Sequence, residues 1–508
     1  MTRRIAWCVA YLTIVTATAR ADAPKPADSA NPVVEETWES VQIDGARVGA
    51  VHTIVQTVDA DSAKRLRTTI ALDLTFKRHN ATVQLRMERG DEETADGVVT
   101  AVFMRQYQGQ ERKLDLTGTI EDGRMHVLID AGRIDRRLRW GDDIVGVYRL
   151  EHMFQERKPK PGDHFTIPTY QPTLNAVVPT QMLVKDVEEV AAAGGPISLL
   201  RVEMRPDKIE GSGVSVQLPP EIWWLDGDFI PVRRQMELEG LGSLLLTRTT
   251  HDAATTAGAG QLPDLNQRNL IPLNRTIPRP HTIRSAVYRI AMRDDPQPET
   301  AFADDGHQDV VAVRAGVVDL HVHPVLPGGA KDASPAPAEF LESSRFIDCD
   351  DPHIKELAAK AVGVEKNAWK KALLIERWVN QNMRPDDAAP FGPASQAAHN
   401  LRGDCRLSAL LTAGLCRAEG VPSRTAIGLL YVEKGGKPYL GFHMWTEVFI
   451  DGQWLGLDGM LGQGGVAADH VKVAHHSWHG VESLTPLLPV RRVLGKTTVE
   501  VVSFDSGD

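Results

Sequence analysis

Between Glu35 and about Thr250, apolar and polar residues alternate along short runs, and this alternation constrains the fold more than any other feature. Apolar side chains fill every second position of residues 70–76, and residues 83–87 repeat the pattern. A period of two is typical of a strand with one buried face. Asp-Gly dipeptides, which favour tight hairpin turns, separate several runs, as at Asp226-Gly227. The sequence therefore predicts a large antiparallel β domain over residues 34–251.

The rest of the chain divides by composition. With 508 residues, the chain is too long for one hydrophobic core. Residues 252–280 lack periodicity and are rich in small and polar residues, which indicates a linker. Residues 281–325 hold a few strands, which form a small β module or complete the first sheet. Residues 326–345 indicate a second linker, and helical patterns appear within residues 346–508, which we expect to form an α+β domain.

The N-terminus has the pattern of an export signal. Arg3 and Arg4 precede the apolar stretch Ile5–Val15, which is too short to span a bilayer of about 20 helical residues. Small residues at Ala19 and Ala23 end two patterns typical of signal cleavage. We predict that residues 1–23 are a signal peptide and that the protein is periplasmic or secreted, without a membrane span after cleavage. An uncleaved anchor is the alternative.

Charge and composition limit the partners. The net charge of -10 argues against general nucleic-acid binding, which requires a basic face. After signal cleavage the cysteines are Cys349, Cys405 and Cys416, an odd number. At least one of them would therefore be a thiol or pair between chains, and a thiol in an exported protein indicates a reactive role.

Cys405 stands at the start of a predicted helix. Apolar residues recur at helical spacing over Cys405–Glu419, Asp404 is a candidate N-cap, and Gly420 and Pro422 end the helix. The exposed N–H groups and dipole of a helix N-terminus favour an anion, so a thiolate is stabilised there. The same N–H groups could hold an oxyanion. The charge of Asp404 opposes the thiolate, so we expect a cationic imidazole to offset it.

The other two cysteines allow a different interpretation. Cys405 and Cys416 would lie about 16 Å apart on one helix, beyond disulfide reach. Cys416 is expected in the core. Cys405 paired with Cys349, or an inert buried Cys405, is the structural alternative to a reactive thiol.

A predicted hairpin brings a histidine and an aspartate together. Tyr439–Ile450 and Trp454–Asp458 have strand character, and Asp451-Gly452 favours a two-residue turn. With that turn Ile450 faces Gln453. The numbers of any two residues that face each other across the hairpin therefore add up to 903. His443 and Asp458 become diagonal neighbours on one face, where the carboxylate can orient the imidazole. A loop one residue longer would put Asp458 on the wrong face.

These segments together resemble the transglutaminase-like superfamily of cysteine enzymes. The resemblance covers about 125 residues of the C-terminal third. It is carried by Gly403-Asp404-Cys405, Leu410-Leu411 and Cys416–Arg424 for the nucleophile segment, His443–Val448 for the histidine strand and Trp454–Asp458 for the aspartate strand. Gly459 departs from the pattern, since the family usually has proline there.

The resemblance implies a papain-like α+β fold and acyl transfer from an amide through a cysteine thioester. Cys405 would be the nucleophile, His443 would transfer the proton and Asp458 would complete the triad. The acceptor would be an amine or water, giving transamidation, proteolysis or deamidation, and the substrate a protein or peptide. We expect no cofactor and no metal. A catalytically silent domain that binds peptide or glycan is the alternative, and a structural β protein with a disulfide between Cys405 and Cys349 is a third possibility.

A histidine cluster follows the aspartate strand. It consists of His470, His475, His476 and His479. His475 and His479 have the spacing of a metal pair on one helix, but no Glu or Cys completes a site within the cluster, which offers only Asp469. We therefore interpret the cluster as a polar surface loop, with metal binding as the alternative.

Overall fold

The computed structural model describes residues 31–506, apart from 61–62, 79–80, 109–110, 131–133, 193, 212–213, 217, 239–241, 257–261, 265–268, 294, 296, 329–334, 388 and 482–484. The chain forms two compact units, which meet in the sequence between Pro263 and Asp264. The predicted signal peptide, residues 1–23, lies outside the described residues. Among the described helices, none is both long and apolar enough to cross a membrane.

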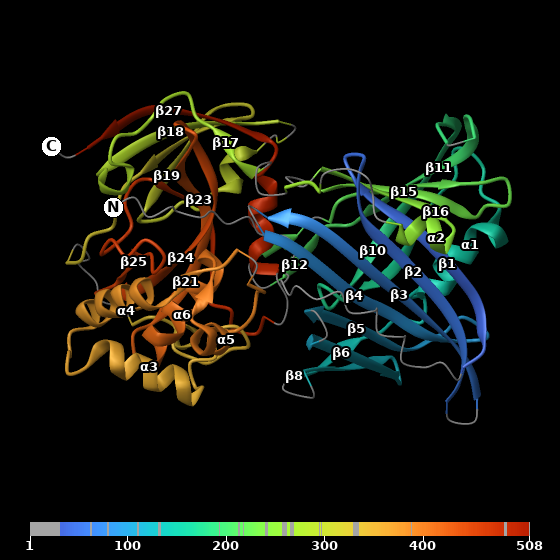
Figure 1. Ribbon diagram of the computed structural model, residues 1–508, viewed down its shortest axis with the longest axis horizontal. Helices are drawn as coiled ribbons and strands as arrows, with labels where there is room; N and C mark the ends of the chain where they lie inside the picture. The colour runs from blue at the N-terminus through green and yellow to red at the C-terminus, as the bar shows by residue number, and fades with distance from the viewer. Residues whose placement is uncertain are drawn as a thin grey trace. The chain divides into compact units, whose positions relative to one another are not determined.

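The N-terminal unit is built on a 14-stranded sheet, which confirms the predicted antiparallel β domain (Figure 1). The strand order is β8-β7-β6-β5-β4-β3-β2-β1-β16-β15-β14-β11-β10-β9. The strands are β1 (Val33–Ile43), β2 (Ala46–Ala60), β3 (Ala63–Arg78), β4 (Ala81–Thr94), β5 (Val99–Gln108), β6 (Glu111–Glu121), β7 (Arg124–Ile129), β8 (Ile134–Arg139), β9 (His164–Gln171), β10 (Ala176–Val190), β11 (Ile197–Pro206), β14 (Glu221–Leu225), β15 (Pro231–Leu238) and β16 (Gly242–Thr249). A separate two-stranded sheet pairs β12 (Ile209–Gly211) with β13 (Val214–Val216), and α2 (His251–Thr255) follows β16.

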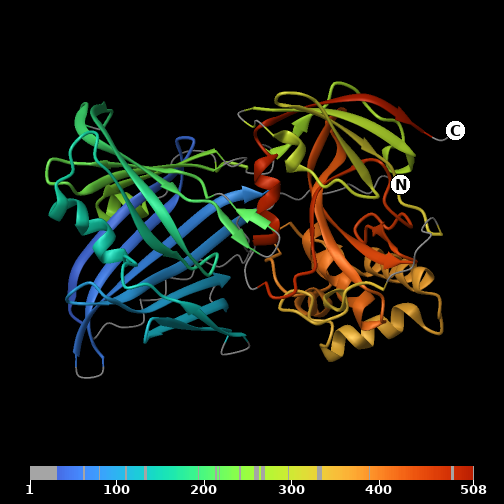
Figure 2. The ribbon, with the colours of Figure 1, turned by 180° about the vertical axis from the view of Figure 1, so that it is seen from behind.

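The sheet curves strongly, as the view from behind shows (Figure 2). Val145 bridges to Thr169 near one end of the strand order, and Trp140 packs on Tyr170 with ring centroids 5.6 Å apart. Trp140 directly follows β8 at the opposite end of the strand order. The two ends of the sheet therefore approach each other and enclose a shared interior.

One helix of this unit, α1 (Val147–Arg157), has no predicted counterpart. Its N-cap residue Gly146 provides no side-chain cap. The caps come instead from β4, where Asp91 Oδ2 accepts a hydrogen bond from Val147 N at 2.6 Å and Glu93 Oε1 accepts one from Tyr148 N at 2.9 Å. Carboxylates more than 50 positions away in the sequence thus satisfy the exposed N–H groups.

The C-terminal unit combines two sheets with a group of helices. A five-stranded sheet has the order β17-β24-β23-β26, with β25 also paired to β24, and a four-stranded sheet has the order β19-β20-β18-β27. Their strands are β17 (Ile271–Pro272), β23 (Ser423–Lys434), β24 (Lys437–Ile450), β25 (Gln453–Leu457), β26 (His470–His476), β18 (Ser285–Met292), β19 (Gln308–Arg314), β20 (Val317–Val322) and β27 (Thr497–Asp505). The short strands β21 (Arg384–Pro385) and β22 (Arg402–Gly403) pair in parallel.

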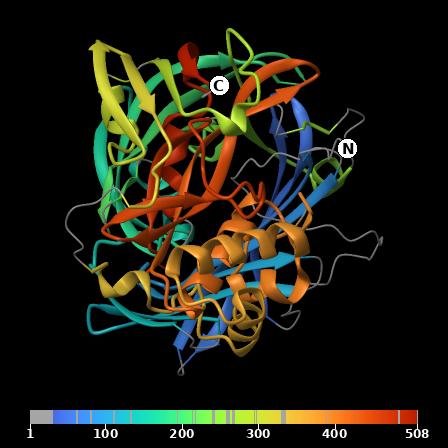
Figure 3. The same ribbon diagram turned by 90° about the vertical axis from the view of Figure 1, so that its left-hand side faces the viewer.

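The four α-helices of this unit gather on one side of the β23–β24 pair, as Figure 3 shows with this unit toward the viewer. They are α3 (Pro352–Val362), α4 (Ala368–Asn382), α5 (Ala394–Asn400) and α6 (Cys405–Ala418). α6 contacts α3, α4 and α5 as well as β23 and β24. All its residues from Cys405 to Arg417 are therefore buried, although the sequence predicted only one apolar stripe.

The predicted division differs from the structure at two places. Within the predicted linker 252–280, β17 pairs with β24 and joins the sheet of the C-terminal unit. The predicted module 281–325 does not close on itself or join the first sheet, because β27, at the far end of the chain, pairs with β18. Both strands depend on partners distant in the sequence, which local periodicity does not reveal.

Candidate functional site

Cys405 is the first residue of α6 and is completely buried. The predicted N-cap is confirmed, because Asp404 Oδ1 accepts hydrogen bonds from Arg406 N at 2.9 Å and from Leu407 N at 3.4 Å. Arg406 Nε also donates to Asp404 Oδ2 at 2.8 Å, and both side chains are buried. A guanidinium, rather than the expected imidazole, therefore offsets the charge of Asp404 beside the thiol.

The three cysteines of the described chain are thiols, and no disulfide joins them. The alternative in which Cys405 pairs with Cys349 is therefore wrong for this structure. Cys416 is fully buried in the core, as predicted, and burial raises the pKa of its thiol far above the ordinary value. Burial also raises the pKa of Cys349. Neither of these two thiols is in a state suited to act as a nucleophile at neutral pH.

His443 and Asp458 are in direct contact. The hairpin register is the predicted one, with Ile450 opposite Gln453, and His443 Nε2 lies 2.7 Å from Asp458 Oδ2. Both side chains are buried. Because Nε2 faces a carboxylate, it carries the proton, and Nδ1 remains as the basic atom of the neutral ring.

Two hydrogen bonds fix the packing of α6 on β23 and β24. Thr446 Oγ1 donates to Ala409 O, and Ser423, which pairs with Val448, donates to Ala413 O, each at 2.8 Å. One turn of α6 thus covers the same length as two residues of β24. By the same correspondence Cys405, one turn before Ala409, would come level with Met444, which is next to His443 in the sequence. Contact between the sulfur and the imidazole itself stays a prediction.

His470 is a buried member of this site that the sequence interpretation missed. It lies on β26 and is fully buried, so the predicted surface loop is wrong for His470, whereas His475 and His479 are exposed. Its Nε2 is 3.3 Å from Asp458 Oδ2 and its Nδ1 is 2.7 Å from Asp469 Oδ1. Asp469 Oδ2 in turn lies 2.5 Å from His281 Nδ1. The Asp-His dipeptide at 469–470 was a possible signal, but only the sheet pairing places it beside Asp458.

The pKa shifts of Asp458 and His470 determine which groups in this chain of contacts are charged. Burial alone would raise the pKa of Asp458, but His443 and His470 outweigh it and hold that pKa well below its usual range. Burial would lower the pKa of His470, yet Asp469 and Asp458 raise it to about 9. At neutral pH His470 is therefore a buried cation between two carboxylates.

His443, Asp458 and His470 could also ligate a metal, since their donor atoms lie within 4.8 Å of one another. Two imidazoles and a carboxylate suit a divalent cation. To bind a metal, the rings of His443 and His470 would have to give up their hydrogen bonds to Asp458. His470 would also have to lose its proton. The present arrangement satisfies the groups without an ion, and the expectation of no metal stays a prediction.

The raised pKa of His470 predicts a pH dependence of stability. Its stabilising contribution is fully present below pH 6.5 and is lost as pH rises toward about 9, because the folded state holds the proton more tightly. The loss should reach at most about 3 kcal/mol. Urea titrations of the wild type and His470→Asn across this pH range should show a decline in the wild type that is absent from the variant. Parallel declines in both proteins would contradict the assignment.

The loop after Asp458 is held by α4 and α6. Glu376 Oε1 accepts a hydrogen bond from Asp458 N, and Glu376 Oε2 accepts one from Gly464 N, each at 2.9 Å. Burial raises the pKa of Glu376 to about 7. At Gly459, an added Cβ would lie 2.4 Å from Thr412 Oγ1 and 2.9 Å from Val379 Cγ1. The close approach of α6 explains glycine where the family usually has proline.

Gly459→Ala is expected to destabilise the protein by about 1–3 kcal/mol, because the new methyl group overlaps two buried side chains. Urea unfolding measures the change. Gly227→Ala is the control, because an added Cβ would meet no atom within 4 Å at Gly227. Gly480→Ala is unsuitable, because Gly480 has a positive φ. Gly227→Ala should change stability by less than about 0.5 kcal/mol. Equal effects of the two substitutions would show that the close packing is not what demands glycine at 459.

A cluster of buried charges lies on the His443 face of β24. Glu447 Oε1 pairs with Lys472 Nζ at 2.6 Å and Glu447 Oε2 pairs with Arg424 Nε at 2.7 Å. Lys472 Nζ also contacts Asp305 Oδ2 at 2.5 Å. Burial opposes ionisation of Glu447, but Lys472 and Arg424 hold its pKa well below the usual range. The cluster links β24 to β23, to β26 and to the loop before β19.

Comparison with protein families finds a match over part of the chain. Residues 355–459 match the transglutaminase-like superfamily, and this segment contains Cys405, His443 and Asp458. None of the curated proteins compared with the chain matches it.

Three solved structures are distantly similar. A proposed cysteine protease from Cytophaga hutchinsonii is 18% identical over 43% of this chain and 82% of its own, with a TM-score of 0.25. A β-barrel-like protein of a domain of unknown function from Brucella abortus is 12% identical over 43% of this chain and 98% of its own, with a TM-score of 0.30. A proposed exported protein with a YmcC-like fold from Bacteroides fragilis is 12% identical over 43% and 97%, with a TM-score of 0.21. Over residues 355–459 the chain carries a domain of the transglutaminase-like superfamily.

Proposed function

We propose that the C-terminal unit is a cysteine enzyme that transfers an acyl group from an amide of a protein or peptide through a thioester on Cys405. The observation that carries the proposal is the buried pair of His443 Nε2 and Asp458 Oδ2 at 2.7 Å. This pair leaves Nδ1 of His443 as the base that we assign to the Cys405 thiol. The match to the transglutaminase-like superfamily over residues 355–459 supports it.

In the proposed reaction, Nδ1 of His443 takes the proton of the Cys405 thiol and the sulfur attacks the amide carbon. The N–H groups at the start of α6 stabilise the oxyanion. The C–N bond then breaks, and the amine leaves with the proton from His443. Water or a second amine attacks the thioester, which releases the acid or the new amide and restores the thiol.

Burial favours a second candidate, a silent domain that binds peptide or glycan. Cys405 is 0% exposed and His443 is 2% exposed, so an active enzyme must open before a substrate reaches the sulfur. A silent domain requires no such opening. Thiol reactivity separates the two candidates.

Alkylation by iodoacetamide at pH 7 tests the proposal, with the modified cysteine located by peptide mass. We expect Cys405 to react selectively and fast, because the helix N-terminus and His443 should stabilise its thiolate, while Cys349 and Cys416 stay unmodified. His443→Ala should slow the reaction of Cys405 by about 100-fold. Uptake of dansylcadaverine into dimethylated casein, and cleavage of casein, then distinguish an amine from water as acceptor. The activity that the wild type shows should be abolished in Cys405→Ser and should persist in EDTA.

A folded protein whose Cys405 reacts no faster than Cys349 would refute the enzyme proposal and favour the silent domain. Equal alkylation rates in the wild type and in His443→Ala would refute the role of His443.

We also propose that the protein is exported, on the basis of the N-terminal pattern. N-terminal sequencing of the protein from fractionated cells should find a start after Ala19 or Ala23 in the periplasmic or secreted fraction. An intact N-terminus in the cytoplasmic fraction would refute export.

A further inference from the structure

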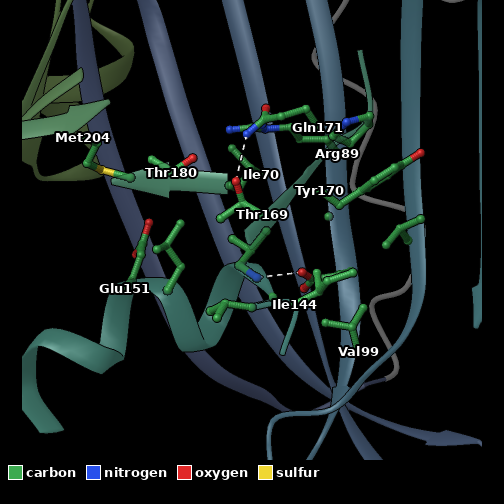
Figure 4. A pocket seen from close by; sticks show the side chains of 18 of the residues that line it. Ile70, Arg89, Val99, Ile144, Glu151, Thr169, Tyr170, Gln171, Thr180 and Met204 are labelled. Carbon is green, nitrogen blue, oxygen red and sulfur yellow. Dashed lines mark hydrogen bonds between the residues drawn. The ribbon is translucent and has the colours of Figure 1, made fainter. Parts of the chain in front are cut away.

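The interior of the N-terminal sheet contains a cavity of about 120 Å³ (Figure 4). Residues from β4 line it together with residues from β9, β10 and β11, which stand near the other end of the strand order. α1 and the segment before it complete the wall. No ligand site was predicted in this sheet, because the lining residues come together only when the sheet curves.

Much of the lining is apolar, with Ile70, Val99, Val102, Ile144 and Trp223 among the wall residues. An apolar cavity of about 150 Å³ can take up a molecule the size of benzene. The cavity therefore suits a small molecule with an apolar part. Buried charges in the same wall supply the polar part of the recognition.

Arg89 is the unusual residue of this wall. Its guanidinium forms no hydrogen bond or ion pair with any residue that the structure describes. The other arginine of the lining, Arg234, is paired, since its Nε donates to Glu39 at 3.0 Å and its Nη1 lies 3.4 Å from Glu151. Burial lowers the pKa of Arg89, against the attraction of Glu221, Asp91 and Glu151. A guanidinium presents five N–H donors in a planar fork that matches a carboxylate.

A second polar group next to Arg89 is also incompletely satisfied. Asp91 lines the cavity, is 4% exposed and uses only Oδ2, which caps α1, while Oδ1 has no hydrogen-bond partner. Burial and the neighbouring Glu93 raise the pKa of Asp91 to about 8. A protonated Asp91 can donate a hydrogen bond from Oδ1 to an oxygen of a ligand.

We propose that this cavity is a binding site for a small monocarboxylate with an apolar chain, held by Arg89 and Asp91. The guanidinium takes the carboxylate through paired N–H groups, Asp91 contacts it through Oδ1, and the chain packs on the apolar wall. Oδ1 of Asp91, which has no hydrogen-bond partner without a ligand, and the Arg89 guanidinium thus gain partners with it. The site is independent of the proposed chemistry at Cys405.

Calorimetric titration of the full chain with straight-chain monocarboxylates from acetate to hexanoate tests this site. We expect saturable binding with an optimum at an intermediate chain length, since the cavity limits the chain. The matching primary alcohols should not bind. Arg89→Gln should weaken binding at least about tenfold. Arg124→Gln, at an exposed arginine on β7, is the matched control and should bind like the wild type.

Should Arg89→Gln fail to fold, Ile144→Phe fills the cavity from the opposite wall, keeps the guanidinium and should abolish binding. The proposal is overturned if no carboxylate of the series, at about 10 mM, binds the wild type. Equal binding by Arg89→Gln and the wild type, or binding of phosphate in place of carboxylates, would also overturn it.

Discussion

Lys472→Met is expected to lower the free energy of unfolding by about 3–5 kcal/mol. The substitution removes the cation that contacts both Glu447 and Asp305 and leaves Glu447, which is 3% exposed, with Arg424 as its remaining partner. A buried carboxylate that loses a cation keeps its desolvation cost without the attraction that offset it. Urea unfolding at pH 7 measures the difference.

Lys371→Met is the matched control. Lys371 pairs with Glu419 at 2.8 Å, but both side chains keep about a fifth of their surface exposed. Its loss should cost under about 1 kcal/mol. The double variant Lys472→Met/Glu447→Gln should recover part of the stability lost in Lys472→Met, because the buried charge is gone. If the double variant is no more stable than the single one, packing rather than charge explains the effect.

Asp458→Asn should have the largest effect on the site. Asp458 Oδ2 contacts both His443 and His470, so the amide cannot replace the carboxylate toward two imidazoles. The proton on Nε2 of His443 is no longer fixed by a negative charge, and alkylation of Cys405 should slow by about 100-fold. His470 loses one of its two carboxylates, so the free energy of unfolding should fall by roughly 1–3 kcal/mol.

His470→Asn separates these two effects. It keeps the contact between His443 and Asp458, so alkylation of Cys405 should slow by less than tenfold while stability falls, if His470 acts only by positioning Asp458. A loss as large as that of Asp458→Asn would give His470 a direct part in the chemistry. Alkylation rates unchanged in both variants would contradict the proposed role of the carboxylate.

Much of the candidate site could be predicted because its signals are local. The cap of α6, the position of Cys405 in its first turn and the β24–β25 register each depend on residues a few positions apart. The two-residue turn at Asp451-Gly452 fixes the register, and the register places His443 beside Asp458. The Arg406 partner of Asp404 was missed, although it lies only two residues away, because side-chain direction is not visible in a pattern.

The alternation of apolar residues determined the large antiparallel sheet, since a period of two admits few other structures. Tertiary structure alone decided what the sheet and the site enclose. The caps of α1 come from β4, the second partner of Asp458 comes from β26, and β27 completes a sheet begun more than 200 residues earlier. Periodicity reports which face of an element is buried, whereas the partner on that face is set by packing between distant segments. For this reason the sequence indicated a cysteine, a histidine and an aspartate, while His470 and the cavity around Arg89 emerged only from the fold.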